Sequence, residues 1–394
     1  MQPERLVYLD HAATTPTDPR VVEAMLPYFS DVYGNPSSVH SFGRKADKAV
    51  QAARRTIADI LNCSPREIVF TGCGSESDNL ALRGAIQTAL GRGTVRPHLI
   101  TSPVEHHAVS HTAHLLADTL PCDLTMLEVD SYGRVLPDTL RAAMRDTTAL
   151  VSVMVGNNEV GTIQPVAELA AIAHERGALF HTDAVQAAGQ LRIDVKAIGA
   201  DLLALTAHKF YGPKGVGLLY MREGVELVPS QSGGGQERDR RAGTHNVPLI
   251  VGMAKALELA YTDFDARVTE YRRLRDMIIN GVLTLVAGSH LTGHPTDRLS
   301  NHASFIIENI DANALLMHLD MHGIAASSGS ACNTGNPEPS DVLSAMGYSR
   351  ELALGSLRLT VGKQTTDADI HHLLEVLPAS VDKLHAVKLT QTLA

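Results

Sequence analysis

Short apolar runs alternate with amphipathic helical patterns along most of the chain. The runs expected to form buried strands are residues 67–70, 98–102, 149–155, 178–182, 202–205 and 217–221. Helical patterns fit between them at residues 75–90, 107–116 and 166–176. Strands that alternate with helices are typical of a largely parallel sheet covered by helices. The sequence therefore predicts an α/β fold.

The pattern changes after residue 250. A long charged helical pattern at residues 265–285 precedes shorter apolar runs at 303–307 and 357–361, with helices between them. We expect a large α/β domain over residues 15–255. Residues 1–14 and 256–394 would form a smaller α+β domain, and no flexible linker marks the boundary.

Composition excludes several classes of protein. The formal net charge of −9 argues against a general nucleic-acid binder. No apolar run approaches membrane-spanning length and no hydrophobic signal region follows the first residues, so we expect a cytoplasmic protein without a membrane partner. The four cysteines, Cys63, Cys73, Cys122 and Cys332, are too few and too irregularly spaced for a disulfide framework or a CxxC zinc site.

Lys209 lies just after the apolar run 202–205, next to a histidine and a Gly-Pro turn. Open α/β sheets bind their ligands at such strand ends. Lys209 could therefore form a Schiff base with pyridoxal phosphate (PLP). A solvated surface lysine is the alternative, and it would be the better interpretation of any lysine considered alone.

Two other strand ends carry groups that suit the same cofactor. A buried carboxylate such as Asp183 is costly unless a cation pairs with it, and a protonated pyridine nitrogen is one such cation. Capping of a following helix is the alternative role for Asp183. Gly74 and Ser75 lie between a strand and a helix, where free N–H groups could bind a phosphate. An ordinary glycine turn fits these two residues equally well.

Histidines cluster at the start of the helix 107–116. His106, at the junction between strand and helix, could stack on a planar cofactor and exchange protons near neutral pH. His107 and His111 are spaced like metal ligands on one helical face, but no third ligand is evident. We therefore expect surface histidines and no metal at this position.

Two loops are ambiguous. Asn158, in the loop 156–161, could hydrogen-bond a ligand oxygen or simply belong to a turn. The glycine- and arginine-rich stretch 233–244 could bind an anion or be solvated.

Two residues near the C-terminal end are better candidates for chemistry. Cys332 lies among small polar residues, whereas cysteine is usually buried, so it is a candidate nucleophile. Arg358 lies in the strand pattern 357–361. An arginine that faced inward there would need a carboxylate partner, and an amino-acid substrate offers one.

Together these motifs resemble those of cysteine desulfurases of the NifS/IscS-like group I branch, which are PLP enzymes of the class V aminotransferase superfamily. The most specific parts are Ala-His-Lys-Phe-Tyr-Gly-Pro-Lys-Gly at 207–215 and Ser-Ser-Gly-Ser-Ala-Cys at 327–332. The resemblance runs from Tyr8-Leu9-Asp10-His11-Ala12-Ala13-Thr14-Thr15-Pro16 to the Arg358 strand. It implies the fold type I architecture, with a large, mostly parallel sheet domain and a smaller α+β domain.

The resemblance also implies roles for individual residues. Lys209 would form the Schiff base, Asp183 would pair with the ring nitrogen, and His106 would stack on the ring and assist proton transfer. The other cofactor contacts would be Asn158 and Gln186 at the ring hydroxyl, Gly74, Ser75, Thr206 and His208 at the phosphate, and Thr244 at the phosphate of the neighbouring subunit in a homodimer. Arg358, helped by Asn35, would hold the substrate carboxylate, and Cys332 would be the nucleophile.

The implied reaction converts L-cysteine to L-alanine and passes the sulfur, as a persulfide on Cys332, to an acceptor protein. A selenocysteine lyase or another PLP lyase is the alternative activity. A non-catalytic sulfur-carrier subunit is an alternative of a different class. The acceptor stays open among an iron–sulfur scaffold, a tRNA sulfur-modification protein and a DNA sulfur-modification protein.

Overall fold

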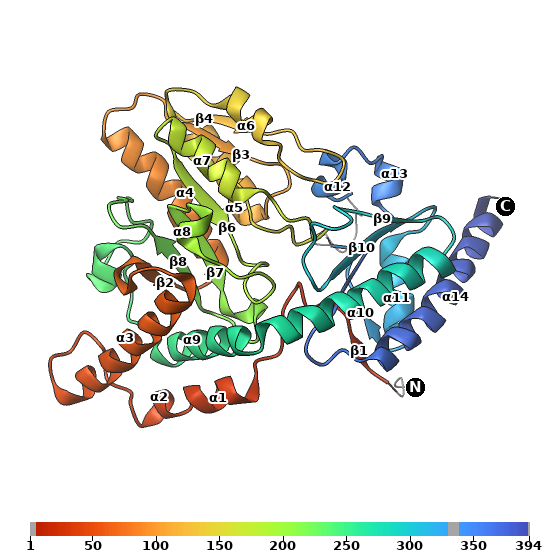
Figure 1. Ribbon diagram of the computed structural model, residues 1–394, viewed down its shortest axis with the longest axis horizontal. Helices are drawn as coiled ribbons and strands as arrows, with labels where there is room; N and C mark the ends of the chain where they lie inside the picture. The colour runs from red at the N-terminus through yellow and green to blue at the C-terminus, as the bar shows by residue number, and fades with distance from the viewer. Residues whose placement is uncertain (1–4, 330–338, 393–394) are drawn as a thin grey trace.

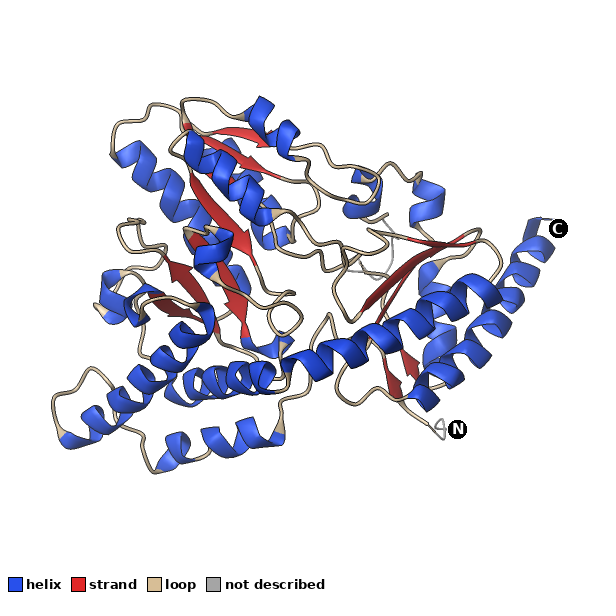
Figure 2. Ribbon diagram, in the orientation of Figure 1, coloured by secondary structure: helices blue, strands red, loops and turns tan. Residues whose placement is uncertain are grey.

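The computed structural model of the protein describes residues 5–329 and 339–392. Its largest element is a seven-stranded sheet with the strand order β2-β8-β7-β6-β5-β3-β4 (Figures 1 and 2). These strands are β2 (Ile68–Thr71), β3 (His98–Thr101), β4 (Asp123–Met126), β5 (Thr148–Ser152), β6 (Leu179–Asp183), β7 (Leu202–Thr206) and β8 (Gly217–Met221). Only β8 runs antiparallel to its neighbours. The predicted α/β fold with a mostly parallel sheet is confirmed.

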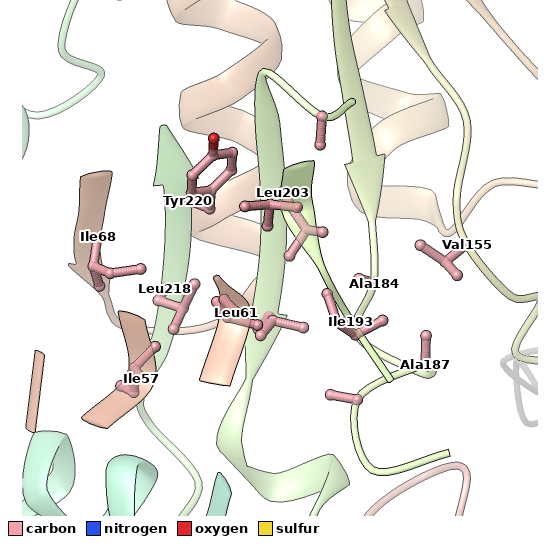
Figure 3. Packing of buried hydrophobic residues seen from close by; sticks show 14 of the residues in the cluster. Ile57, Leu61, Ile68, Val155, Ala184, Ala187, Ile193, Leu203, Leu218 and Tyr220 are labelled. Carbon is pink, nitrogen blue, oxygen red and sulfur yellow. The ribbon is translucent and has the colours of Figure 1, made fainter. Parts of the chain in front are cut away.

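The central strands are apolar on both faces. Successive side chains of a strand point to opposite faces. In β8, Leu218 and Tyr220 pack in one hydrophobic cluster, whereas Leu219 and Met221 pack in another. Ile57 joins the same cluster as Leu218 (Figure 3). Burial on both faces explains why these strands form continuous apolar runs in the sequence.

Helices cover both faces of this sheet. On one face lie α4 (Gly74–Gly91) and α5 (His107–Thr119). On the other lie α3 (Ser41–Leu61), α7 (Val166–Glu175) and α9 (Val247–Thr262). The shorter helices are α1 (Pro19–Met25), α2 (Pro27–Ser30), α6 (Pro137–Ala143), α8 (Val195–Ile198), α12 (Asp341–Ala345) and α13 (Arg350–Ala353).

A second, smaller group of elements lies to the right in Figure 1. It contains the antiparallel strands β9 (Ser289–Leu291), β10 (His302–Ile307) and β12 (Ser356–Thr360), and the parallel pair β1 (Val7–Tyr8) and β11 (Ile324–Ala325). The helices α10 (Phe264–Leu285), α11 (Ala312–Met321) and α14 (Asp367–Thr392) pack on these strands in a separate cluster. Within the described ranges, no helix has the length and apolar content needed to cross a bilayer.

The helices α9 and α10 meet at Asp263 and connect the two groups. The helix predicted at residues 265–285 is found as α10. Ala256, Leu257 and Ala260 of α9 pack in the cluster on the large sheet. The division of the chain at residue 255 stays a prediction, and this packing favours a junction near Asp263.

The carboxyl ends of the parallel strands meet at one edge of the large sheet, where ligands bind in this class of fold. The loop that follows β2 reaches this edge by crossing the start of β8. Gly217 permits the crossing, because a Cβ there would lie 2.6 Å from the carbonyl carbon of Cys73. Gly74 then lies close to the ends of β6 and β7, since its Cβ would be 2.9 Å from Val185 Cγ2 and 3.6 Å from Thr206 Cβ.

Candidate active site

A cavity of about 270 Å³ lies at this edge of the sheet. Its lining brings together five of the predicted site residues, His106, Asn158, Gln186, Lys209 and Arg358. Glu105 and Glu159, for which the sequence predicted no role, also line it. Loops after β3, β5, β6 and β7 and the strand β12 supply these side chains, so residues from most of the chain meet here.

Lys209 ends a short 3-10 turn, Ala207–Lys209, directly after β7. Its Nζ donates hydrogen bonds to the carbonyl oxygens of Ala12 at 2.5 Å and Ala13 at 2.8 Å. Burial lowers the pKa of Lys209 to about 8, and the Arg358 guanidinium adds to the effect. A lysine with a lowered pKa has more neutral, nucleophilic amine near neutral pH.

Asp183 and His106 lie close to this lysine. Asp183 is only 6% exposed, and its Oδ1 accepts a hydrogen bond from Val185 N at 2.8 Å. Burial raises the pKa of Asp183, whereas the charges of His106 and Lys209 oppose the rise. The His106 Nδ1 accepts from Ala108 N at 3.1 Å, which caps α5 and fixes the imidazole beside the cavity. Desolvation lowers the pKa of His106, while Asp183 opposes the shift.

Two more buried carboxyl groups lie near Asp183. Glu105 Oε1 accepts from Ser102 Oγ at 2.8 Å and from Met154 N at 2.9 Å, while Oε2 has no partner among the described residues. Burial raises the pKa of Glu105 to about 8, and it also raises the pKa of Asp78. A cation bound here would relieve the burial of negative charge, as a protonated pyridine nitrogen would.

The predicted phosphate contacts lie where α4 begins. Gly74 is the first residue of α4, and the exposed Ser75 follows it. The Thr206 hydroxyl donates to Val216 O at 3.0 Å, and His208 Nδ1 lies 3.1 Å from Thr14 Oγ1. Because the Thr206 proton is already engaged, the free N–H groups of α4 are the main donors available to an anion. With its lysine, its acidic cluster and this helix N-terminus, the site fits PLP.

Arg358 has a carboxylate partner within the chain. Its Nη2 donates to Asp10 Oδ1 at 2.7 Å, and its Nη1 donates to Asn158 O at 2.8 Å. The sequence predicted that an amino-acid substrate would supply the carboxylate, and it assigned no role to Asp10. The position of Asp10 after a short apolar strand gave no signal of this contact.

Two predicted residues are exposed on loops and do not line the cavity, and a third cannot be placed. Asn35 is exposed between α2 and α3, where its Oδ1 accepts from Ser37 N at 2.9 Å. Thr244 is exposed on the glycine-rich loop. Cys332 lies outside the described residues.

The His107 and His111 rings stack with their centroids 4.4 Å apart. Across residues 5–329 and 339–392, no cluster of three or more His, Cys, Asp or Glu side chains is arranged to hold a metal ion. Both histidines are exposed on α5, and His107 also lines the cavity.

The loop that carries Thr244 has an unusual backbone. Glu237, Arg238 and Asp239 are three consecutive non-glycine residues with positive φ. Glu237 is buried, and its carboxylate accepts from Arg54 Nη2 at 2.8 Å and from His245 Nε2 at 2.7 Å. Such backbone strain persists only where the surroundings hold it in place. Arg54, His245 and the backbone N–H of Phe70 hold the Glu237 carboxylate in place here.

Comparison with known proteins agrees with this site. The family described as aminotransferase class-V matches residues 7–373. Cysteine desulfurase IscS of Methanosarcina thermophila is 48% identical over 380 residues, which cover 96% of this chain and 93% of that protein. The protein of the same name from Dictyoglomus turgidum is 45% identical over 384 residues, which cover 98% of this chain and 96% of that protein.

Solved structures give the same result. A NifS-like protein superposes with a TM-score of 0.89 at 36% identity, over 96% of this chain and all (100%) of that chain. The structure of SspA in complex with cysteine superposes with a TM-score of 0.79 at 36% identity, over 90% of this chain and 98% of that chain. The chain therefore belongs to the class-V aminotransferase family and, within it, to the cysteine desulfurases of the IscS and NifS type.

Proposed function

We propose that this protein is a PLP-dependent cysteine desulfurase. It converts L-cysteine to L-alanine and passes the sulfur, as a persulfide on Cys332, to an acceptor protein. The observation that carries the proposal is the cavity in which Lys209, His106 and Arg358 meet beside the buried Asp183. The names of the relatives, and the cysteine in the SspA complex, support this reaction over a selenocysteine lyase, another PLP lyase or a non-catalytic carrier.

PLP supplies an electron sink that draws charge from the α-carbon of a bound amino acid. The residues of the chain bind the cofactor and the substrate and transfer protons. Lys209 holds the cofactor covalently and moves a proton to and from the substrate, a task helped by its lowered pKa. When the cofactor is bound, Asp183 would stabilise positive charge at the ring nitrogen, and His106 would lie against the ring and exchange protons.

The remaining residues bind and orient. Asn158 and Gln186 would bind the ring hydroxyl. Gly74, Ser75, Thr206 and His208 would surround the phosphate, with the N–H groups of α4 as the main donors, because the Thr206 hydroxyl already donates to Val216 O. Arg358 would bind the substrate carboxylate; the predicted help from Asn35 would need this residue to come closer, since it does not line the cavity. The Cys332 thiolate then attacks the substrate sulfur, so that an S–S bond forms as the C–S bond breaks.

Replacing Cys332 with serine should lower the turnover of L-cysteine at least about a hundredfold, because serine is a far weaker nucleophile toward sulfur. The visible absorbance of the bound cofactor should not change. Production of alanine and sulfide measures the effect.

Cys63→Ser is the matched control, since burial raises the pKa of the Cys63 thiol to about 12 and leaves it unreactive. Full turnover in Cys332→Ser would show that the nucleophile is assigned wrongly. If Cys332→Ser still turned over L-selenocysteine at the unmodified rate but not L-cysteine, the result would instead support a selenocysteine lyase.

We further propose that the protein works as a homodimer in which Thr244 contacts the phosphate of the neighbouring subunit. Large apolar side chains are exposed along α1, α2 and the start of α3, at Leu26 (58%), Phe29 (60%), Tyr33 (66%) and Phe42 (51%). Apolar patches of this kind mark protein–protein interfaces. The loop with Asn35 belongs to the same segment, so a partner subunit seated there also lies near that residue.

Replacing Phe29 with glutamate should weaken self-association by about 2 kcal/mol or more, because a buried apolar anchor becomes a charge. Sedimentation equilibrium measures the change, and the turnover should fall with the dimer fraction. Met317→Glu, which changes a 65% exposed side chain of α11, is the control. A protein that is monomeric and fully active before any substitution contradicts the homodimer.

We also propose a reducing, cytoplasmic location, which suits a reaction that needs free thiols. Cys63, Cys73 and Cys122 are all unpaired. The acceptor is a protein of iron–sulfur assembly or of tRNA or DNA sulfur modification.

A further inference from the structure

We infer that Asp10 is a positioning residue for substrate binding, which acts by fixing Arg358 in the cavity. The inference rests on the proposed function, because it concerns the group that binds the carboxylate of the amino-acid substrate. Asp10 does not line the cavity itself, whereas Arg358 does. Its effect on the substrate would therefore pass through the arginine.

The contacts of the Arg358 guanidinium define its position. Asp10 accepts from Nη2 at 2.7 Å, and the carbonyl oxygen of Asn158 accepts from Nη1 at 2.8 Å. The carbonyl oxygen of Gly329 lies 3.5 Å from Nη1. Nε is buried and has no partner among the described residues. Asp10 thus holds one end of the guanidinium and the Asn158 carbonyl holds the other.

The position of Asp10 does not depend on the arginine. Thr360 N donates to Leu9 O at 2.7 Å, and Ala12 N donates to the Thr360 hydroxyl at 2.9 Å. Asp10 and Thr360 themselves form a backbone bridge. The segment around Asp10 is therefore hydrogen-bonded to β12 at Thr360, only two residues from Arg358.

Through this arrangement, Asp10 would strengthen substrate binding by ordering the Arg358 side chain beforehand and not by adding positive charge to the site. A free arginine side chain has several rotamers, and ordering it when a ligand binds reduces affinity. The Asp10 carboxylate removes much of that freedom beforehand. It also balances the arginine charge, so the site would attract a carboxylate through aligned N–H donors rather than through net positive charge.

The test uses the holoenzyme and two probes: L-alanine, which carries the carboxylate, and ethylamine, which lacks it. Asp10→Ala should raise the Kd of L-alanine about tenfold, or about 1.4 kcal/mol, and leave the Kd of ethylamine unchanged. Calorimetry measures both. Asp10→Asn keeps an acceptor for Nη2 without the charge, and it should stay within about threefold of the unmodified protein. In turnover, Asp10→Ala should raise KM for L-cysteine with kcat nearly unchanged.

Two further variants complete the test. In the Arg358→Ala background, Asp10→Ala should add no further loss of L-alanine affinity, since the residue acts through Arg358. If Asp10→Ala does not fold, Asp10→Ser replaces it, because serine is too short to reach Nη2.

An equal loss of ethylamine binding, an Asn variant as weak as the Ala variant, or an unchanged Kd of L-alanine would overturn the inference. A protein that binds L-alanine as described but does not release sulfur from L-cysteine would instead contradict the proposed function alone.

Discussion

Replacing Lys209 with alanine should lower the turnover of L-cysteine at least about a thousandfold and leave the purified protein without covalently bound PLP. Lys209 Nζ lies in the cavity, held by the Ala12 and Ala13 carbonyl oxygens, and its pKa is lowered to about 8. No other lysine lines that cavity among the described residues. The variant therefore loses both the covalent attachment and the group that moves the substrate proton.

The measurements are alanine production and the visible absorbance of the protein after gel filtration. Lys214→Ala is the matched control, since Lys214 is an exposed lysine of the same loop that does not line the cavity. It should keep its colour and its turnover. A Lys209→Ala protein that retained a tenth of the activity would show that the proton is moved by another group.

The second large effect is on stability. Replacing Arg54 with alanine should lower the free energy of unfolding by about 3–5 kcal/mol, because it leaves the Glu237 carboxylate buried without its main partner. Arg54 is 3% exposed and pairs with both oxygens of Glu237, at 2.9 and 2.8 Å. Urea unfolding measures the change. Arg55→Ala, at an exposed position on the same helix, should change stability little.

The effect of Arg54→Ala should depend on pH. Burial would raise the pKa of Glu237, but hydrogen bonds from His245 and Arg54 outweigh it and hold the pKa at about 2. A carboxyl whose pKa is lower in the folded state stabilises the fold at pH values above its unfolded pKa. That contribution is lost as the pH falls toward 2. The stability difference between the two proteins should therefore narrow below about pH 4.5. A difference that is constant with pH would mean that the ion pair is not its cause.

Strands that are buried on both faces were predicted more accurately than strands that are only half buried. β7 and β8 were found at the predicted positions within one residue, since strands buried on both faces leave long apolar runs. β4 was missed. Its four residues, Asp123–Met126, form a half-buried edge strand in which polar and apolar residues alternate. A pattern this short does not stand out in a sequence.

In the site, residues with a signal in the adjacent sequence were predicted, whereas contacts that depend on the fold were missed. Lys209 and His106 were predicted to lie in the site because each follows a strand whose end is readable locally, and both line the cavity. Asp10 was not predicted to lie in the site, because it pairs with a residue 348 positions away and only the fold brings the two together. Asp183 was predicted, but its acidic neighbours Asp78 and Glu105 were missed for the same reason, since the three residues come from a strand, a helix and a loop that only the fold brings together.

The hydrogen bonds between residues 9–13 and β12 affect the order in which the protein folds on the ribosome. The segment with the Ala12 and Ala13 carbonyl groups, which Lys209 contacts, leaves the exit tunnel long before Thr360, to which it is hydrogen-bonded. Folding proceeds from the N-terminus during translation, so the large sheet can form while this segment still has no partner. A nascent chain would thus complete its catalytic cavity only after Thr360 has left the tunnel.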